Sequence, residues 1–377
     1  MKILLLTDSD AFAGTEQHML SLATALSREG QLVYVGSPSG SPLAKRCEAS
    51  GIKTLAVEKK GVVDLGAVAA CVRHIRRESI DVLHVHNARM ALVASIVRLF
   101  VQSIKIVFTQ HFIAPTHVSR HGLKRILSDV IHRFIAGGLD QIVCVSFATR
   151  TAMLQRGGPY AHCHSTVIYN GIDANQYNLQ SADDVSNAKV ELNIPTESTV
   201  VLIASRLELE KAVDVGLTAF ASLVADGRKL ILVIAGQGSQ LSDLKQLASN
   251  LGVEHSVRFI GFRSDIPVLM SASDIFLFTS PVDSFGMSIL EAMATMTPVV
   301  AANEGGPLEI ITDRQTGFLF SKGDVTDLRQ KVMDCLMCPH LDQMTSLARN
   351  NVENLFSVRT MAIETIKIYE SIGSRAL

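Results

Sequence analysis

The sequence contains no tryptophan and only five tyrosines among its 377 residues. Proteins that bind single-stranded nucleic acids stack the bases on aromatic side chains, so this scarcity disfavours that class. A basic surplus is missing too, because 35 lysine and arginine residues stand against 36 aspartate and glutamate residues. We therefore expect no nucleic-acid partner. With 47% hydrophobic and 19% charged residues, the composition instead favours large buried sheets.

The sequence also has no long apolar run. The longest, Met90–Val101, is interrupted by Arg98 and is too short to cross a bilayer. The apolar run at the N-terminus meets Asp8 and Asp10 almost at once, which predicts a first strand rather than a signal peptide. We therefore expect a cytoplasmic protein, either free or peripheral on the inner face of the membrane.

The six cysteines are scattered, and without a signal peptide they are expected to be free thiols. Cys335 and Cys338 have metal-ligand or redox spacing, but they stand alone in a helical pattern, where such spacing merely places them on one face. His162 and His164 alternate around Cys163, and no second cluster completes a zinc site. We expect no metal site.

Short runs rich in valine, isoleucine and leucine alternate with amphipathic segments along the chain. Continuous apolar runs indicate strands buried on both faces, and strands that alternate with helices give a parallel, doubly wound sheet. The first series of expected strands covers residues 2–7, 31–36, 53–57, 81–85, 105–109, 141–145 and 165–169. The second series covers residues 199–204, 230–235, 256–260, 274–279, 298–302 and 317–320.

A turn signal at Asn170–Asp173 and a polar segment at Asp183–Lys189 indicate a junction between the two series. The fold class is therefore α/β, with two doubly wound, Rossmann-like domains that face a deep cleft. In such sheets, ligands bind at the carboxyl ends of the strands.

The most informative stretch follows the expected strand 274–279. A loop leads to a helix of about Gly286–Thr295, and such a helix start binds anions through its unpaired N–H groups and its dipole. Asp283 and Glu291 flank this start. The alternative needs no ligand: Asp283 or Ser284 would be the helix N-cap, and Ser288 with Glu291 would form a capping box.

Asp283, Phe285, Gly286 and Glu291 together resemble the signature of retaining glycosyltransferase family 4. Its usual pattern is Glu, any residue, Phe, Gly, four further residues and Glu, so Asp283 stands where a longer Glu is usual. The resemblance covers nearly the whole chain and implies the GT-B architecture. An acceptor-side domain would span residues 1–180 with a last helix of about 357–377, and a nucleotide-sugar donor domain would span 181–356.

A second motif follows the expected strand 199–204. Arg206 and Lys211 resemble the family's Arg-x4-Lys clamp for the donor diphosphate, in which arginine supplies a fork of donors and lysine a point charge. The alternative is a solvated loop with Lys211 paired to Glu208. Ala212 stands where the family usually has glycine.

The resemblance implies further donor contacts. The backbone at the helix start would meet the phosphates, and the Glu291 carboxylate would accept hydrogen bonds from the ribose hydroxyls. Gly305 and Gly306 would let the chain approach the cleft, or would form a plain turn. The backbone of Gly261–Arg263, which follows a strand, would contact the base. The remaining residues expected to bind the donor are Gly14, Arg263, Gly286, Met287 and Ser288.

In the first domain, His111 ends a strand and resembles the family's cleft histidine, near the anomeric carbon of the donor sugar. A structural histidine is the alternative, because the chain has 12 histidines. His84 and His86 also end a strand but match less well. Asp8 and Asp10 form a D-x-D sequence that holds a metal in another transferase architecture; its place in the first loop argues against that role here.

These motifs predict a retaining enzyme that moves a sugar from a UDP- or GDP-type donor to a hydroxyl acceptor. It would act in cell-surface polysaccharide or glycolipid synthesis and would need no metal or other cofactor. The expected catalytic residues are His111, Asp283, Arg206 and Lys211. A nucleotide-sugar epimerase of the same fold and a non-catalytic binding homologue are the alternatives. The basic, amphipathic segment Val118–Phe134 would suit an anionic membrane and a lipid-linked acceptor, or would be an ordinary surface helix.

Overall fold

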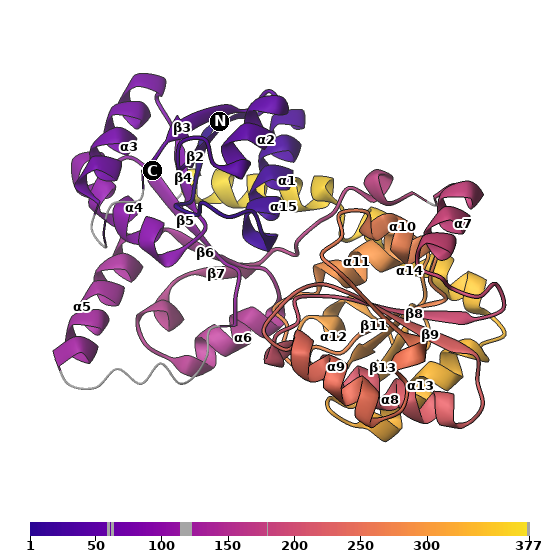
Figure 1. The fold of residues 1–377 in the computed structure, drawn as a ribbon. Coiled ribbons are helices and arrows are strands. Elements are labelled where there is room, and N and C mark those ends of the chain that lie inside the picture. The colour runs from indigo at the N-terminus through magenta and orange to yellow at the C-terminus, as the bar shows by residue number, and fades with distance from the viewer. Residues whose placement is uncertain (59–60, 62–63, 114–122, 179, 375–377) are drawn as a thin grey trace. The chain divides into compact units, whose positions relative to one another are not determined.

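The computed structural model describes residues 1–58, 61, 64–113, 123–178 and 180–374. The chain forms two compact α/β units, one from Met1–Gly171 with Ser357–Leu377 and the other from Ile172–Phe356 (Figure 1). Each unit is built on a parallel sheet with helices on its two faces. The prediction of two doubly wound, Rossmann-like domains is confirmed.

The first unit holds a seven-stranded sheet in the order β3-β2-β1-β4-β5-β6-β7. All of its paired strands are parallel, because a helix or a helical turn returns the chain after each strand. The strands are β1 Lys2–Leu6, β2 Leu32–Ser37, β3 Lys53–Ala56, β4 Val82–Val85, β5 Lys105–Gln110, β6 Gln141–Cys144 and β7 Ser165–Val167.

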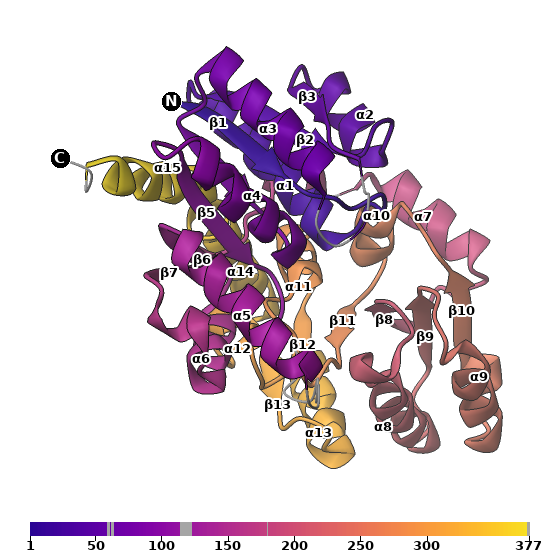
Figure 2. The same ribbon diagram turned by 90° about the vertical axis from the view of Figure 1, so that its left-hand side faces the viewer.

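Both faces of this sheet are covered, as the continuous apolar runs predicted. Ile3 and Leu5 face one core with helices α1, α2 and α15, whereas Leu4 and Leu6 face the other core with α3, α4 and α5 (Figure 2). The helices of this unit are α1 Gly14–Arg28, α2 Pro42–Ala49, α3 Leu65–Glu78, α4 Ala88–Phe100, α5 Leu123–Gly138, α6 Phe147–Arg156 and α15 Val358–Ser374, with the 3-10 helix η1 Pro159–His162.

The second unit holds a six-stranded parallel sheet in the order β10-β9-β8-β11-β12-β13. One face packs on α8, α9 and α13 through a single apolar cluster. Its strands are β8 Thr199–Ala204, β9 Leu230–Ala235, β10 Val257–Gly261, β11 Ile275–Phe278, β12 Val299–Ala302 and β13 Phe318–Phe320. Its helices are α7 Ala182–Glu191, α8 Val213–Ala225, α9 Leu241–Asn250, α10 Ile266–Ser271, α11 Met287–Ala294, α12 Pro307–Ile310, α13 Val325–Leu336 and α14 Leu341–Asn354, with 3-10 helices η2 Ala174–Tyr177, η3 Leu209–Lys211 and η4 Glu254–Ser256.

In both sheets the strand order reverses once. The reversal lies between β1 and β4 in the first unit and between β8 and β11 in the second. At such a switch point, the loops that follow the two strands leave in opposite directions and open a crevice at their carboxyl ends, where ligands bind in doubly wound folds. We therefore expect ligands to bind at the loops after β1 and β4, and at the loops after β8 and β11.

The chain passes between the units at residues 171/172 and 356/357. The expected junction at 180/181 lies further along the chain, after η2, whereas the second passage coincides with the expected residue 357. Ile172 N donates to Phe356 O (2.9 Å), and a Cβ on Gly171 would lie 2.3 Å from Ser357 O. Glycine at 171 therefore lets the two connecting segments run against each other. Residues 375–377 of the expected last helix lie outside the described residues.

Candidate functional site

The switch point of the second unit brings two loops together. Residues 205–212 follow β8 and residues 279–286 follow β11, the neighbouring strand. Thr279 Oγ1 donates to Lys211 O (2.7 Å), and Lys211 Nζ lies 2.8 Å from Asp283 Oδ2. The side chains of this ion pair are only 18% and 20% exposed. Two residues predicted to be catalytic from separate motifs thus meet across the switch point.

Asp283 also shapes its own loop. Its Oδ1 accepts a hydrogen bond from Phe285 N (3.1 Å), so one carboxylate oxygen closes a turn while the other holds Lys211. Aspartate is suited to such a local turn because its side chain is short. This geometry gives a structural reason for Asp at the position where the family usually has Glu. The alternative pairing of Lys211 with Glu208 is wrong, because Glu208 accepts from Ser239 N and Oγ (3.2 and 2.6 Å).

Arg206, the other member of the expected clamp, is placed differently. Its Nη2 lies 3.0 Å from Glu210 Oε1, and its side chain is 69% exposed. Such an exposed pair contributes little to stability. Arg206 can therefore leave Glu210 for a stronger anion with little loss to the fold.

Helix α11 begins at the switch point without a side-chain cap. Its N-cap is Gly286, with φ 106°, and no side chain bonds to the cap position. The alternatives that made Asp283 or Ser284 the cap, and Ser288 with Glu291 a capping box, are therefore wrong. A Cβ at Gly286 would lie 2.9 Å from Ile289 Cδ1, and the left-handed φ disfavours other residues. The first-turn N–H groups of Met287 and Ser288 lie at the positive end of the helix dipole.

Glu291 lies on the same helix and meets a tyrosine that the motif did not include. Tyr177 in η2 donates its hydroxyl to Glu291 Oε1 (3.2 Å). Burial raises the pKa of Glu291, and the hydrogen bond from Tyr177 partly offsets this rise. No spacing rule linked Tyr177 to Glu291, because they lie in distant parts of the sequence.

Glycines in neighbouring segments allow close packing against the backbone of both loops. A Cβ at Gly305 would lie 2.6 Å from Asp283 O, and one at Gly306 would lie 2.1 Å from Phe285 O. These two glycines therefore support the 283–285 loop. Gly236 and Gly238, which sequence reasoning missed, do the same for the other loop: Cβ atoms there would lie 1.8 Å from Ser205 O and 2.3 Å from Leu207 O. The Gly-x-Gly spacing after β9 was the available signal.

The side chain of Arg263 is engaged by two carboxylates rather than directed at a ligand. Its guanidinium bonds to both carboxylate oxygens of Glu191 (2.5 and 3.3 Å) and of Asp265 (2.8 and 2.6 Å). The expectation for this segment concerned its backbone, and that expectation stands as a proposal. Phe262 beside it is 75% exposed.

The switch point of the first unit is lined by histidines. His84 in β4 has both ring nitrogens engaged, Nδ1 with Tyr369 Oη and Nε2 with Thr109 Oγ1, each at 2.6 Å. Tyr369 belongs to α15, so the last helix fixes the orientation of this ring from the face of the sheet that α1 and α15 cover. His84 is therefore a structural residue.

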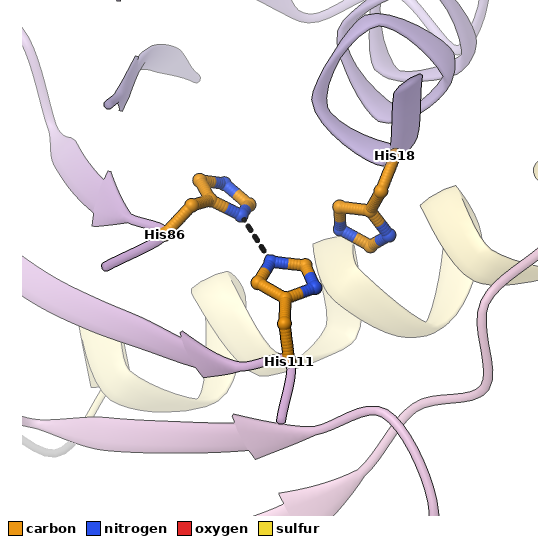
Figure 3. A group of neighbouring side chains, drawn as sticks. All are labelled: His18, His86 and His111. Atoms are coloured by element: carbon orange, nitrogen blue, oxygen red, sulfur yellow. Dashed lines mark hydrogen bonds between the residues drawn. The ribbon is translucent and has the colours of Figure 1, made fainter. Parts of the chain in front are cut away.

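His86 and His111 follow β4 and β5, and His18 approaches them from α1 (Figure 3). His86 Nδ1 and His111 Nε2 are hydrogen-bonded at 3.1 Å. Burial lowers the pKa of His111 and of His86, and it lowers that of His18 to about 4, against a small rise from the Asn170 amide. All three imidazoles are therefore uncharged at neutral pH. His111, predicted from the sequence, is confirmed as a strand-end residue, and His18 was missed.

The D-x-D sequence is not arranged as a metal site. Asp8 Oδ2 pairs with Arg89 Nη1 (2.6 Å), and Asp8 Oδ1 accepts from Asn87 Nδ2 (3.0 Å).

Gly14 begins α1, where Glu16 Oε2 accepts from Ala13 N (2.9 Å), and a Cβ at Gly14 would meet nothing within 4 Å. Packing thus does not require glycine at this position.

Comparison with known proteins identifies the family. Residues 12–176 match the family described as Glycosyltransferase Family 4, and residues 184–352 match Glycosyl transferases group 1. The chain belongs to glycosyltransferase family 4. The two matches fall on the two α/β units, and the fold is GT-B. The protein is therefore a glycosyltransferase.

Two relatives of this family 4 protein are informative. N-acetyl-alpha-D-glucosaminyl L-malate synthase of Bacillus anthracis is 29% identical over 313 residues, which cover 82% of this chain and 79% of that protein. A crystal structure of Anabaena Alr3699/HepE in complex with UDP has a TM-score of 0.84 at 26% identity, covering 98% of this chain and 100% of that one. The same protein in complex with UDP-glucose has a TM-score of 0.81, with the same identity and coverage.

Two expectations about the rest of this family 4 chain can be compared with the structure. The six cysteines are free, in agreement with the prediction. Among the described residues, no helix combines the length and the apolar character needed to cross a membrane.

Proposed function

We propose that this protein transfers a sugar from a UDP-sugar to a hydroxyl acceptor, with retention of the anomeric configuration. The observation that carries the proposal is the ion pair of Lys211 and Asp283 at the switch point of the second unit, beside the uncapped start of α11. The UDP and UDP-glucose complexes of the Anabaena relative favour uridine over guanosine in the donor. In a retaining reaction, the acceptor attacks the donor face from which the diphosphate departs.

The charged groups of the switch point suit a diphosphate leaving group. Lys211 is held in place before the donor arrives, and a preorganised cation stabilises the charge that develops in the transition state. Arg206 joins it by leaving Glu210, and the N–H groups of Met287 and Ser288 complete the phosphate contacts. Asp283 acts by positioning Lys211 and the loop.

Glu291 would bind the ribose. A carboxylate can accept two hydrogen bonds from a diol, and Tyr177 already orients one of its oxygens. The backbone at Gly261–Arg263 and the exposed ring of Phe262 would lie against the base. His111 would act on the sugar as a neutral hydrogen-bonding group near the anomeric carbon.

The transfer would need no metal, because protein cations and N–H groups handle the diphosphate. Chelation tests this point directly. Activity should survive dialysis against EDTA, and adding magnesium or manganese should not raise it. A loss on chelation that manganese restores would contradict the metal-free assignment.

The donor is tested with a panel of nucleotide sugars. A ligand that binds only the folded protein raises the midpoint of thermal unfolding, so UDP-sugars should raise it more than GDP-sugars. Turnover of the preferred donor with trial acceptors then separates transfer from rearrangement, and NMR of the product gives the anomeric configuration. The matched families are both transferase families, so the comparisons do not support an epimerase.

The acceptor would be met by the first unit, in polysaccharide or glycolipid synthesis. Four large apolar side chains of α5 are exposed by 39% to 61%: Ile126, Leu127, Val130 and Phe134. A hollow of about 190 Å³ lies beside this helix, lined in part by Phe108, Tyr160 and Arg156. Residues 118–122 of the expected basic segment lie outside the described residues.

This exposed face of α5 would hold the protein on the cytoplasmic surface of an anionic membrane, next to a lipid-linked acceptor. Sedimentation with vesicles tests the idea. The protein should bind vesicles that contain anionic lipid at low salt, and Val130→Asp with Leu127→Asp should abolish binding. If the protein does not bind these vesicles at low salt, the membrane proposal is wrong and a water-soluble acceptor is the alternative.

A further inference from the structure

Three imidazoles from separate elements converge in the first unit. His18 comes from α1, His86 follows β4 and His111 follows β5 (Figure 3). One ring nitrogen from each can be chosen so that all three lie within 4.8 Å of one another. Among the described residues, this is the one group of three potential ligands so arranged.

The hydrogen bonds of the cluster are incomplete. No well-formed hydrogen bond reaches either ring nitrogen of His18, although the Asn170 amide lies near enough to raise its pKa, and His86 Nε2 has no partner among the described residues. These rings are 7% and 2% exposed, and His111 is 9% exposed. Buried polar atoms without partners are rare in folded proteins, and a bound water or ion is one way in which such atoms are satisfied.

The neighbouring His84 shows what a satisfied histidine looks like in this place. Both of its nitrogens are hydrogen-bonded, and its ring stacks on His86 with centroids 4.4 Å apart. His84 thus fixes the orientation of His86 without being a ligand itself.

We propose that His18, His86 and His111 bind a divalent transition-metal ion of the zinc class. Neutral imidazole is the form that coordinates such ions, and three histidines leave a fourth, open position. Metal–nitrogen distances of about 2.0–2.1 Å place two tetrahedral ligands roughly 3.3 Å apart. The nitrogens of His86 and His111 are already 3.1 Å apart, so His18 is the ring that must move inward.

The chemistry of the ligands selects the ion. The cluster contains no carboxylate, so magnesium and calcium, which prefer oxygen ligands, are disfavoured. The bound ion would occupy His111. If His111 acts on the donor sugar, which rests on the proposed function, micromolar zinc should inhibit a transfer reaction that otherwise needs no metal.

Metal binding itself is tested without any activity measurement. Protein free of a histidine tag is stripped with EDTA, dialysed and titrated with Co²⁺, whose tetrahedral complexes absorb strongly in the visible range. Zinc affinity is then measured by competition with a chromogenic chelator. We expect each chain to bind one equivalent of Co²⁺ and to give a spectrum typical of nitrogen ligands. This spectrum should disappear when zinc displaces the cobalt.

His18→Ala removes a ligand that has no part in the proposed transfer chemistry. Because loss of an outer partner already costs about 10–100-fold in metal affinity, loss of a ligand should cost at least about 100-fold. His255→Ala is the matched control, since His255 is exposed in η4 of the other unit, and it should bind the metal normally. Circular dichroism and a melting curve check that His18→Ala is folded, and His18→Gln serves if it is not.

The outcomes are distinct. Absence of a tetrahedral Co²⁺ spectrum from the wild type would overturn the site, and so would thiolate charge-transfer bands, which would assign the metal to cysteines. Equal affinity in the wild type and a folded His18 variant would overturn it as well. Binding without inhibition of transfer would leave the metal site standing and remove His111 from the reaction.

Discussion

The two switch points of this protein have the same topology and an ion pair each, but within the described residues only that of the first unit holds a cluster of uncharged histidines. In the second unit, the loops after β8 and β11 bring together Lys211 and Asp283, and the following helix α11 carries Glu291. In the first unit, the loops after β1 and β4 carry an ion pair of Asp8 and Arg89 together with the uncharged His86, and His111 follows the next strand. The fold therefore supplies the place, and the residues after each strand decide what can bind there.

The difference fits the two halves of a glycosyl transfer. A leaving diphosphate carries charge and needs cations and N–H groups that are already oriented. A neutral sugar or hydroxyl needs hydrogen-bonding groups, and a buried charge near it would be costly to desolvate. We therefore expect the nucleotide to bind the second unit and the neutral partners to bind the first.

The largest effect is expected for Lys211→Ala, which removes the preorganised cation. Loss of one such donor typically lowers kcat by about 10²–10³-fold. Arg206→Ala should cost less, because Arg206 must first leave Glu210. Steady-state kinetics with the preferred UDP-sugar gives both numbers. Lys229→Ala is the control, since Lys229 is 75% exposed in a surface pair with Glu197; a rate for Lys211→Ala close to that of this control would contradict the assignment.

Next comes His111→Ala, which removes the predicted sugar contact from the histidine cluster of the first unit. We expect kcat to fall by roughly 10–10²-fold with little change in the affinity for UDP, because we propose that the nucleotide binds the other unit. Kinetics and UDP binding are measured on the same preparation. Exposed His162→Ala should behave as wild type. A His111 variant that lost UDP affinity as well would break the division between the units.

A smaller effect is expected for Tyr177→Phe. The Tyr177 hydroxyl lowers the pKa of Glu291, so its removal raises that pKa further. The ribose needs the ionised carboxylate, so UDP affinity should fall as the pH drops through this pKa, and in the variant the fall should begin at a higher pH. Because this hydrogen bond only orients the carboxylate that would contact the ribose, we expect roughly a three- to tenfold change in KM. Superimposable pH profiles of the variant and wild type would show that Tyr177 does not tune Glu291; Tyr169→Phe serves as control.

The smallest effect concerns the backbone of the Lys211 loop. Ala212 has φ 47° and ψ 43°, the left-handed conformation that glycine adopts most easily. Ala212→Gly relieves this strain but frees the unfolded chain, so the net gain should be under about 1 kcal/mol. Ala219→Gly, inside the right-handed helix α8, should instead destabilise by about 1 kcal/mol. Urea unfolding compares the two; equal destabilisation would show that residue 212 is unstrained.

Local patterns in the sequence were sufficient to predict the strands. All the expected strands are present, with ends shifted by a residue or two, because buried parallel strands have continuous apolar runs. The loops after β8 and β11 were found because the residues of each motif lie within a few positions of one another along the chain. Glu291 and Lys211 could therefore be named before the structure.

Partners that are distant in sequence could not be predicted. Asp283 meets Lys211, and Tyr177 meets Glu291, only because the fold brings their segments together. His18 lies on the buried face of α1, where its pattern is that of an ordinary core position. The sequence placed Arg263 after a strand, but it could not show that the Arg263 side chain pairs with Glu191 and Asp265.

The most direct test of the division between the units is calorimetric titration of UDP into three proteins: wild type, Lys211→Ala and His111→Ala. A hydrogen bond to a charged group is worth about 1.5–3 kcal/mol, so Lys211→Ala should bind UDP at least about tenfold more weakly. His111→Ala should bind UDP as the wild type does. Unchanged affinity in Lys211→Ala, or a comparable loss in His111→Ala, would contradict the claim that the charged switch point of the second unit holds the nucleotide.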